Sequence, residues 1–92
     1  MPTGQIDFED VPTATVFDVF TETASQLIGR YVGRSQRAET QEERAGMWSK
    51  AMAVRDAKHG VPARDRDQLI EYIEVWRHDI AQLDEGDHGS AG

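Results

Sequence analysis

Residues 64–84 read RDRDQLIEYIEVWRHDIAQLD and contain the longest unbroken helical pattern in the chain. The main apolar residues recur at spacings of four and three, which places side chains along one side of an α-helix. They are Leu69, Ile73, Trp76, Ile80 and Leu83. Three further apolar residues, Ile70, Tyr72 and Val75, widen this stripe on both sides. We therefore predict a helix over about 64–84 with an apolar arc wide enough to contact two neighbours.

An earlier segment, about residues 13–34, shows the same periodicity. Pro12 directly precedes it, and proline is favoured at helix starts. Gly29 and Gly33 each disfavour a helix by about 1 kcal/mol relative to Ala, so we predict that the helix ends near Gly33 or slightly beyond. Its apolar stripe consists of Phe17, Phe20, Ala24, Leu27 and Tyr31.

A third segment, about residues 40–59, has clear signals at both ends. The Thr40 hydroxyl can accept a hydrogen bond from the Glu43 amide while the Glu43 carboxylate reaches back, which forms a capping box. Gly60 can take the left-handed conformation that ends a helix, and Pro62 cannot extend it. The side of this helix that should face the core carries little apolar surface, because small residues and arginines share it.

The helices at 40–59 and 64–84 are joined by a short connection, so we predict that they form an antiparallel hairpin. The first helix then closes an all-α three-helix bundle, a single helical domain over residues 11–85. Residues 1–10 and 86–92 contain too little apolar surface to pack alone. We expect them to form a flexible acidic leader and a disordered tail.

The composition excludes several classes of protein. The 92 residues include no cysteine, so neither a disulfide nor a thiolate metal site can form, and a reducing cytoplasmic location is expected. Apolar runs are too short to cross a membrane. The formal net charge of -7 makes direct binding to nucleic acid unfavourable, because phosphate attraction supplies much of such affinity.

The bases are concentrated in the middle of the chain. Residues 30–66 contain nine bases and five acids, whereas both ends are strongly acidic. Arg30, Arg34 and Arg37 would form a stripe if the first helix continued past Gly33. These arginines either complement the helix dipole and solubilise the turn, or contact an acidic protein partner.

No pattern for nucleophilic catalysis or for a zinc site is present. The chain has no Cys nucleophile, no Gly-x-Ser-x-Gly turn and no phosphate-binding glycine loop. Glu74 and His78 are four residues apart, but zinc requires at least three converging ligands. We therefore predict no catalytic residue, no cofactor and no metal site.

One enzymatic alternative rests on acids from two helices, which can hold magnesium over a pyrophosphate. All-α nucleotide pyrophosphohydrolases of the MazG kind are built in this way. The chain resembles them in carrying one acidic set near the start of the second helix and a second set, Glu71-Tyr72-Ile73-Glu74, in the third. This second set lacks the final Asp that such enzymes carry. The first set is Glu39, Glu42 and Glu43.

The preferred hypothesis is a small acidic interaction module that self-associates or binds one protein partner. The wide apolar arc of residues 64–84 leaves surface beyond one hairpin contact, and both tryptophans, Trp48 and Trp76, are expected in the core. The alternative is an acidic inhibitor or antitoxin-like protein that blocks a basic nucleic-acid-binding surface. It would use either the face of Glu71, Glu74 and Glu85 or an N-terminal set of acids, which consists of Asp7, Glu9, Asp10, Asp18 and Glu22. The candidate partner-binding residues are Tyr72, Val75, Trp76, Arg30, Arg34 and Arg37.

Overall fold

The computed structural model describes the backbone of residues 8–90 and the side chains of residues 8–86. Three helices account for most of this part of the chain: α1 (Thr13–Arg37), α2 (Gln41–Gly60) and α3 (Arg66–Ser90). The described residues form no β-strand. They also contain no helical stretch that is long and apolar enough to span a bilayer. The all-α three-helix bundle is therefore confirmed.

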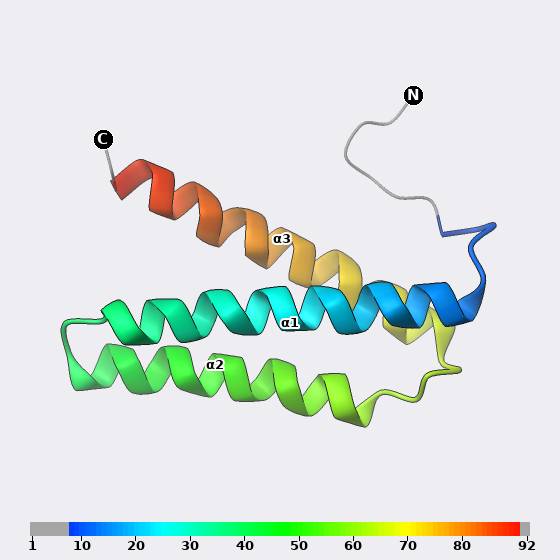
Figure 1. Cartoon of the computed structure of the whole chain (residues 1–92), viewed down its shortest axis with the longest axis horizontal. Coiled ribbons are helices and arrows are strands. Elements are labelled where there is room, and N and C mark those ends of the chain that lie inside the picture. Colours follow the sequence, from blue (N-terminus) through cyan, green and yellow to red (C-terminus); the bar gives the residue numbers. More distant parts are fainter. Residues whose placement is uncertain (1–7, 91–92) are drawn as a thin grey trace.

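Helix α1 is the centre of the bundle, because it contacts both α2 and α3 (Figure 1). Helix α2 lies antiparallel to α1, whereas α3 crosses α1 obliquely and diverges from it towards the C-terminal end. The predicted hairpin needs a correction in its packing. Although the chain runs in opposite directions along α2 and α3, the described residues of α2 and α3 have no Cα pair within 8 Å. The reason is the thin inner face of α2, on which only Ala51 and Val54 are buried.

The ends of the helices follow the local chemistry. Thr40 Oγ1 accepts a hydrogen bond from the Glu43 amide at 3.1 Å, which confirms the predicted cap of α2. At the other end of α2, the Val61 amide donates to the carbonyl oxygen of Ala57 at 3.1 Å, and the Val61 side chain is buried. Asp65 Oδ1 accepts from the Gln68 amide at 3.3 Å and so caps the start of α3.

Two helices are longer than predicted. Helix α1 continues through Gly29 and Gly33 to Arg37, because the favourable contacts of its last turns outweigh the cost of two glycines. Helix α3 continues to Ser90, into residues that we expected to form a tail. No proline follows to stop it, so its backbone hydrogen bonds can extend past Gly86.

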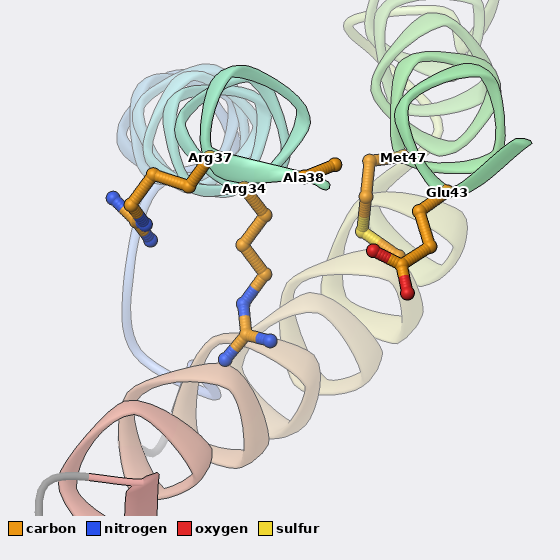
Figure 2. Close-up of a pocket in the computed structure, with 5 residues that line it drawn as sticks. All are labelled: Arg34, Arg37, Ala38, Glu43 and Met47. Carbon is orange, nitrogen blue, oxygen red and sulfur yellow. The ribbon is translucent and has the colours of Figure 1, made fainter. Parts of the chain in front are cut away.

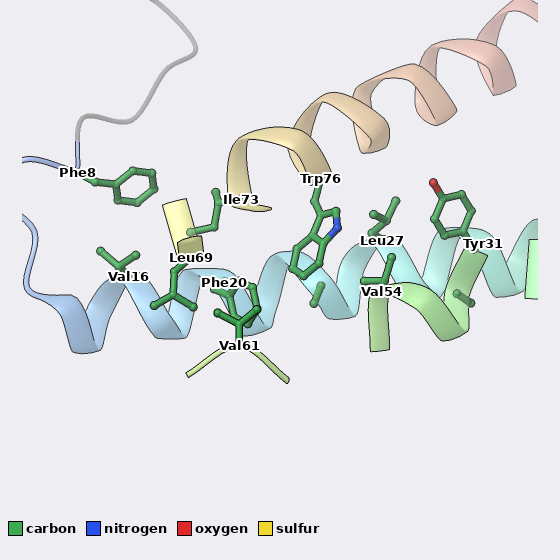
Figure 3. Packing of buried hydrophobic residues seen from close by; sticks show 12 residues of the cluster. Phe8, Val16, Phe20, Leu27, Tyr31, Val54, Val61, Leu69, Ile73 and Trp76 are labelled. Atoms are coloured by element: carbon green, nitrogen blue, oxygen red, sulfur yellow. The ribbon is translucent and has the colours of Figure 1, made fainter. Parts of the chain in front are cut away.

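The core lies mainly between α1 and α3 (Figure 3). Helix α1 contributes a full stripe of buried side chains and α3 contributes three, whereas α2 contributes two. The buried apolar residues are Phe8, Val16, Phe20, Ala24, Leu27, Tyr31, Ala51, Val54, Val61, Leu69, Ile73 and Trp76. Most predicted stripe residues are buried, but at the start of α1 Val16 is buried where Phe17 was expected, and Phe17 is only partly buried. In α3 the last two residues of the stripe, Ile80 and Leu83, are only partly buried.

Phe8 packs on the bundle at the end of the predicted leader, residues 1–10. Residues 1–7 lie outside the described part of the chain, but Phe8 is buried and points towards Ile73 (Figure 3). Arg66 holds this segment, since its guanidinium donates to the carbonyl oxygens of Phe8 and Val11. The Arg77 guanidinium also lies 6.0 Å from the centroid of the Phe8 ring.

Candidate protein-interaction surface

The exposed apolar surface of α3 arises from the way this helix packs. Leu69, Ile73 and Trp76 are buried, so the line that faces α1 is fully used. Tyr72 is half-buried and Val75 is 53% exposed, because they lie to one side of that line and α2 does not reach them. The predicted residues Tyr72, Val75 and Trp76 are thus neighbours on α3, but they differ in exposure: Trp76 is buried, Tyr72 is half-buried and Val75 is exposed.

Aromatic contacts fix the positions of Tyr72 and Trp76. The ring centroids of Tyr72 and Trp76 are 4.9 Å apart, and those of Phe20 and Trp76 are 5.0 Å apart. Phe20 also meets Tyr72 edge to face at 6.1 Å. Offset and edge-to-face arrangements at these distances are favourable. Phe20, a core residue of α1, therefore contacts both aromatic side chains of α3 and fixes their positions.

A surface groove of 240 Å³ lies beside these rings. We call it the α3 groove, and it is lined by Gln68, Glu71, Tyr72, Val75 and Trp76. Its aromatic and aliphatic walls can take an apolar side chain, while Gln68 and Glu71 supply polar groups at the edge.

Acidic residues flank the α3 groove. Glu71 precedes Val75 by four residues and Asp79 follows it by four, so both lie next to Val75 on the helix surface. Glu71 is exposed and Asp79 is half-buried. Burial raises the pKa of the Tyr31 phenol above its ordinary value, and the negative charge of Asp79 raises it further. This charge next to the groove favours a partner with positive charge.

The structure places Trp48 outside the core, so the prediction that both tryptophans are buried is correct only for Trp76. Trp48 is 51% exposed, whereas Trp76 is 4% exposed. The sequence held a signal for this difference: Arg44 and Arg55 share the side of α2 on which Trp48 lies. Burial of that side would have desolvated two guanidinium groups.

Trp48 is the centre of a second surface, on α2. Arg44 and Met52 lie four residues before and after it, and Arg55 lies seven residues after it, so all are on the same side of the helix. Arg44, Trp48 and Arg55 are exposed, and Met52 is half-buried. We call these four residues the Trp48 surface. It combines an aromatic side chain with positive charge.

Arg30 and Arg34, predicted to contact a partner, bind within the chain. Arg30 forms an ion pair with Asp84 of α3, in which Nε lies 2.8 Å from Oδ1. Arg34 Nη2 donates to the carbonyl oxygen of Leu83 at 2.8 Å. The continuation of α1 past Gly33 does bring the arginines onto one helix, as expected. In this structure, however, two of them hold α3 against α1.

Arg37 is exposed at the end of α1. It lines an open cavity of 390 Å³ together with Arg34, Ala38, Glu43 and Met47 (Figure 2). Figure 2 shows this cavity between the end of α1 and the start of α2, above α3. The walls contain both positive and negative side chains, so the cavity has no single charge preference.

The acidic residues of the enzymatic alternative lie on two helices that do not pack against each other. Glu42 and Glu43 belong to the first turn of α2, whereas Glu71 and Glu74 belong to α3. These helices have no close backbone approach within the described residues. Among the residues whose side chains the structure describes, no group of three His, Asp or Glu residues is arranged to hold a metal ion. The geometry therefore gives no specific support to a magnesium site between these helices.

No family model, curated protein or solved structure matches this chain.

Proposed function

We propose that this chain is a small acidic helical interaction module that binds a protein through the α3 groove and has no catalysis of its own. The observation that carries the proposal is the exposure of Val75, 53%, next to the aromatic wall of Tyr72 and Trp76. The protein bound is a second copy of the chain or one other partner. The cysteine-free composition is compatible with a cytoplasmic location.

The character of the groove supports protein binding. Protein interfaces are enriched in tyrosine and tryptophan at their centres and are surrounded by polar groups. The α3 groove has this composition, with Tyr72, Val75 and Trp76 between the polar Gln68 and Glu71. A partner that covered these side chains would remove apolar surface from water, which is favourable by about 25 cal/mol per Å².

The rigidity of the groove also supports this function. Trp76 is buried between α3 and α1, and it packs on both Phe20 and Tyr72. Immobilising a free side chain in an interface costs about 0.5–1.5 kcal/mol. The contacts with Phe20 already fix the aromatic side chains in the free protein. Binding a partner therefore requires little further loss of side-chain entropy.

One observation favours the inhibitor hypothesis as a second candidate. Glu71 lines the groove itself, and Asp79 lies on its other side, so a basic partner surface would be attracted to the same place. In that case the bound partner would be a nucleic-acid-binding protein. Binding would weaken steeply with salt, and nucleic acid would compete for the partner.

The test is photo-crosslinking from defined positions of the chain. A photoreactive amino acid is placed at Val75 in one variant and at Ala81 in a matched control. Both residues are exposed on α3 but lie on different sides of the helix. Each variant is irradiated as pure protein and in an extract of the source cells. Circular dichroism checks that both variants fold like the unmodified chain.

The proposal predicts a protein adduct from position 75 and a much weaker one, or none, from position 81. An adduct of the pure protein at a whole multiple of the chain mass identifies self-association, and an adduct that forms only in the extract identifies a different partner. Equal adducts from both positions, or no adduct from position 75 under either condition, would show that the α3 groove is not a binding surface.

A further inference from the structure

We propose that the occupant of the α3 groove is Trp48 of a second copy of this chain, so that copies associate head to tail. This inference rests on the proposed function, because it names the partner of the α3 groove. It joins the two large exposed hydrophobic side chains of the described structure, Trp48 and Val75, in a single contact.

Trp48 and the α3 groove lie apart within one copy. Trp48 belongs to α2 and the groove belongs to α3, and the described parts of these helices have no Cα pair within 8 Å. Trp48 accordingly remains 51% exposed. One copy therefore offers a projecting aromatic side chain and, on another helix, a groove with aromatic walls. Aromatic rings in offset or edge-to-face contact stabilise an interface beyond the area that they bury.

The charges around the two surfaces are complementary. The charged residues next to Trp48 on its side of α2 are Arg44 and Arg55, both basic. Those four residues from Val75 on α3 are Glu71 and Asp79, both acidic. Seating Trp48 in the groove of another copy brings the two arginines towards the two carboxylates. Such complementarity speeds association and fixes the orientation of the partner.

The same charges disfavour contacts between like surfaces. If two α3 grooves met across a two-fold axis, the Glu71 and Asp79 of one copy would face their own counterparts. If two Trp48 surfaces met, Arg44 and Arg55 of one copy would face the same two arginines of the other copy. Like charges placed opposite each other across an interface disfavour association. The favourable contact therefore pairs unlike surfaces. It closes into a dimer if both copies can make it reciprocally, and otherwise it repeats to form a larger ring or an open chain of copies.

An exposed tryptophan between arginines could also stack on a base of single-stranded nucleic acid. The overall charge argues against this ligand, since the chain carries a formal net charge of -7. Phosphates would be repelled by most of the surface outside the Trp48 surface. The second copy satisfies both the apolar and the charged features of the Trp48 surface, so it is the better match.

The experiment uses two variants, each of which blocks one half of the contact. Trp48→Ala removes the inserted side chain and leaves the groove intact. Val75→Arg fills the groove with a charged side chain and leaves Trp48 intact. Because both positions are about half exposed, neither change removes a core residue, and circular dichroism checks the fold of each. The solution mass is measured by light scattering for each variant alone and for an equimolar mixture.

We expect each variant alone to remain a monomer, and the mixture to form a complex of twice the monomer mass. In that complex Trp48 of the Val75→Arg chain occupies the groove of the Trp48→Ala chain, and no further copy can add. The charge-reversed pair Arg55→Glu and Glu71→Arg provides a second check. Each reversal alone should weaken self-association several-fold, and the two combined in one chain should restore it.

A mixture that stays monomeric would overturn the inference. So would a wild-type chain whose Trp48-dependent fluorescence responds to a single-stranded oligonucleotide but not to protein concentration. If the mixture is monomeric while position 75 still crosslinks another protein, the proposed function stands and only the second copy is excluded. If position 75 crosslinks nothing, both proposals fail.

Discussion

Arg30 of α1 donates two hydrogen bonds to the carboxylate of Asp84 in α3, from Nε to Oδ1 at 2.8 Å and from Nη2 to Oδ2 at 3.1 Å. One turn further along α1, Arg34 Nη2 donates to the carbonyl oxygen of Leu83 at 2.8 Å. The apolar residues of this part of α3, Ile80 and Leu83, are only half-buried. Arginine contacts therefore secure the half of α3 that diverges from α1, whereas apolar packing secures the other half.

We predict that breaking the Arg30–Asp84 pair loosens α3 locally with little effect on global stability. The two side chains are 36% and 48% exposed, and exposed ion pairs contribute about 0.2–1 kcal/mol. Arg30→Ala and Asp84→Ala should each lower the free energy of unfolding by no more than about 1 kcal/mol. Amide hydrogen exchange should become faster in α3 beyond Ile80.

The matched control for this pair is Glu74→Ala, which removes an exposed acid that lies ten positions before Asp84 in α3. It should leave the exchange of these amides unchanged. Unaltered exchange in both Arg30→Ala and Asp84→Ala would show that the pair does not hold the helix.

Phe8→Ala should destabilise the bundle less than a substitution within α1. Loss of a buried Phe side chain typically costs about 3–5 kcal/mol, and we expect that range for Phe20→Ala. When Phe8 is lost, the segment before Pro12 can detach and regain about 1–2 kcal/mol of backbone entropy per residue. The expected loss for Phe8→Ala is therefore about 2 kcal/mol, measured by urea unfolding. A loss equal to that of Phe20→Ala would contradict this view of the segment.

Tyr31 should make the protein sensitive to alkaline pH. The phenol has a pKa raised above 10.0, first by burial and then by the charge of Asp79. Its neutral form is thus favoured in the folded state, and this stability is fully present below pH 10.0 and falls as the pH rises towards the folded-state pKa.

Tyr31→Phe should remove this part of the alkaline loss. Asp79→Asn should lower the pKa of Tyr31, because it removes the nearby negative charge. Urea unfolding as a function of pH, together with phenolate absorbance, measures both effects. Identical alkaline profiles for wild type and Tyr31→Phe would exclude Tyr31 as the group responsible.

The parts of the fold that the sequence predicted well are those with a strong local or periodic signal. The apolar stripe of α3 correctly predicted the core residues Leu69, Ile73 and Trp76. Apolar residues spaced three and four apart lie on one side of a helix, and that side is the one that is buried. Thr40 marked the start of α2 by its hydrogen bond to the Glu43 amide. These features depend on residues within a few positions of each other.

The features that the sequence did not predict depend on contacts between distant residues. Phe8 is buried next to residues far along the chain, and its carbonyl oxygen accepts a hydrogen bond from Arg66, 58 positions away. The exposure of Trp48 depends on which side of α2 packs against α1. The sequence of α2 has too few apolar residues on any one side to predict this, and only Ala51 and Val54 of this helix are buried. The partners of Arg30 and Arg34 became identifiable only once the direction of α3 relative to α1 was known.

The most direct test of the account is the solution mass of the wild-type chain over a wide range of concentration, at low and high salt. The matched variants are Val75→Arg, which blocks the α3 groove, and Ala81→Arg, which places the same charge on another side of α3. The account predicts that the mass of wild type and Ala81→Arg rises above 10.3 kDa with concentration, less so at high salt. Val75→Arg should stay at 10.3 kDa throughout. A wild-type chain that remains at 10.3 kDa at every concentration would contradict self-association through the α3 groove.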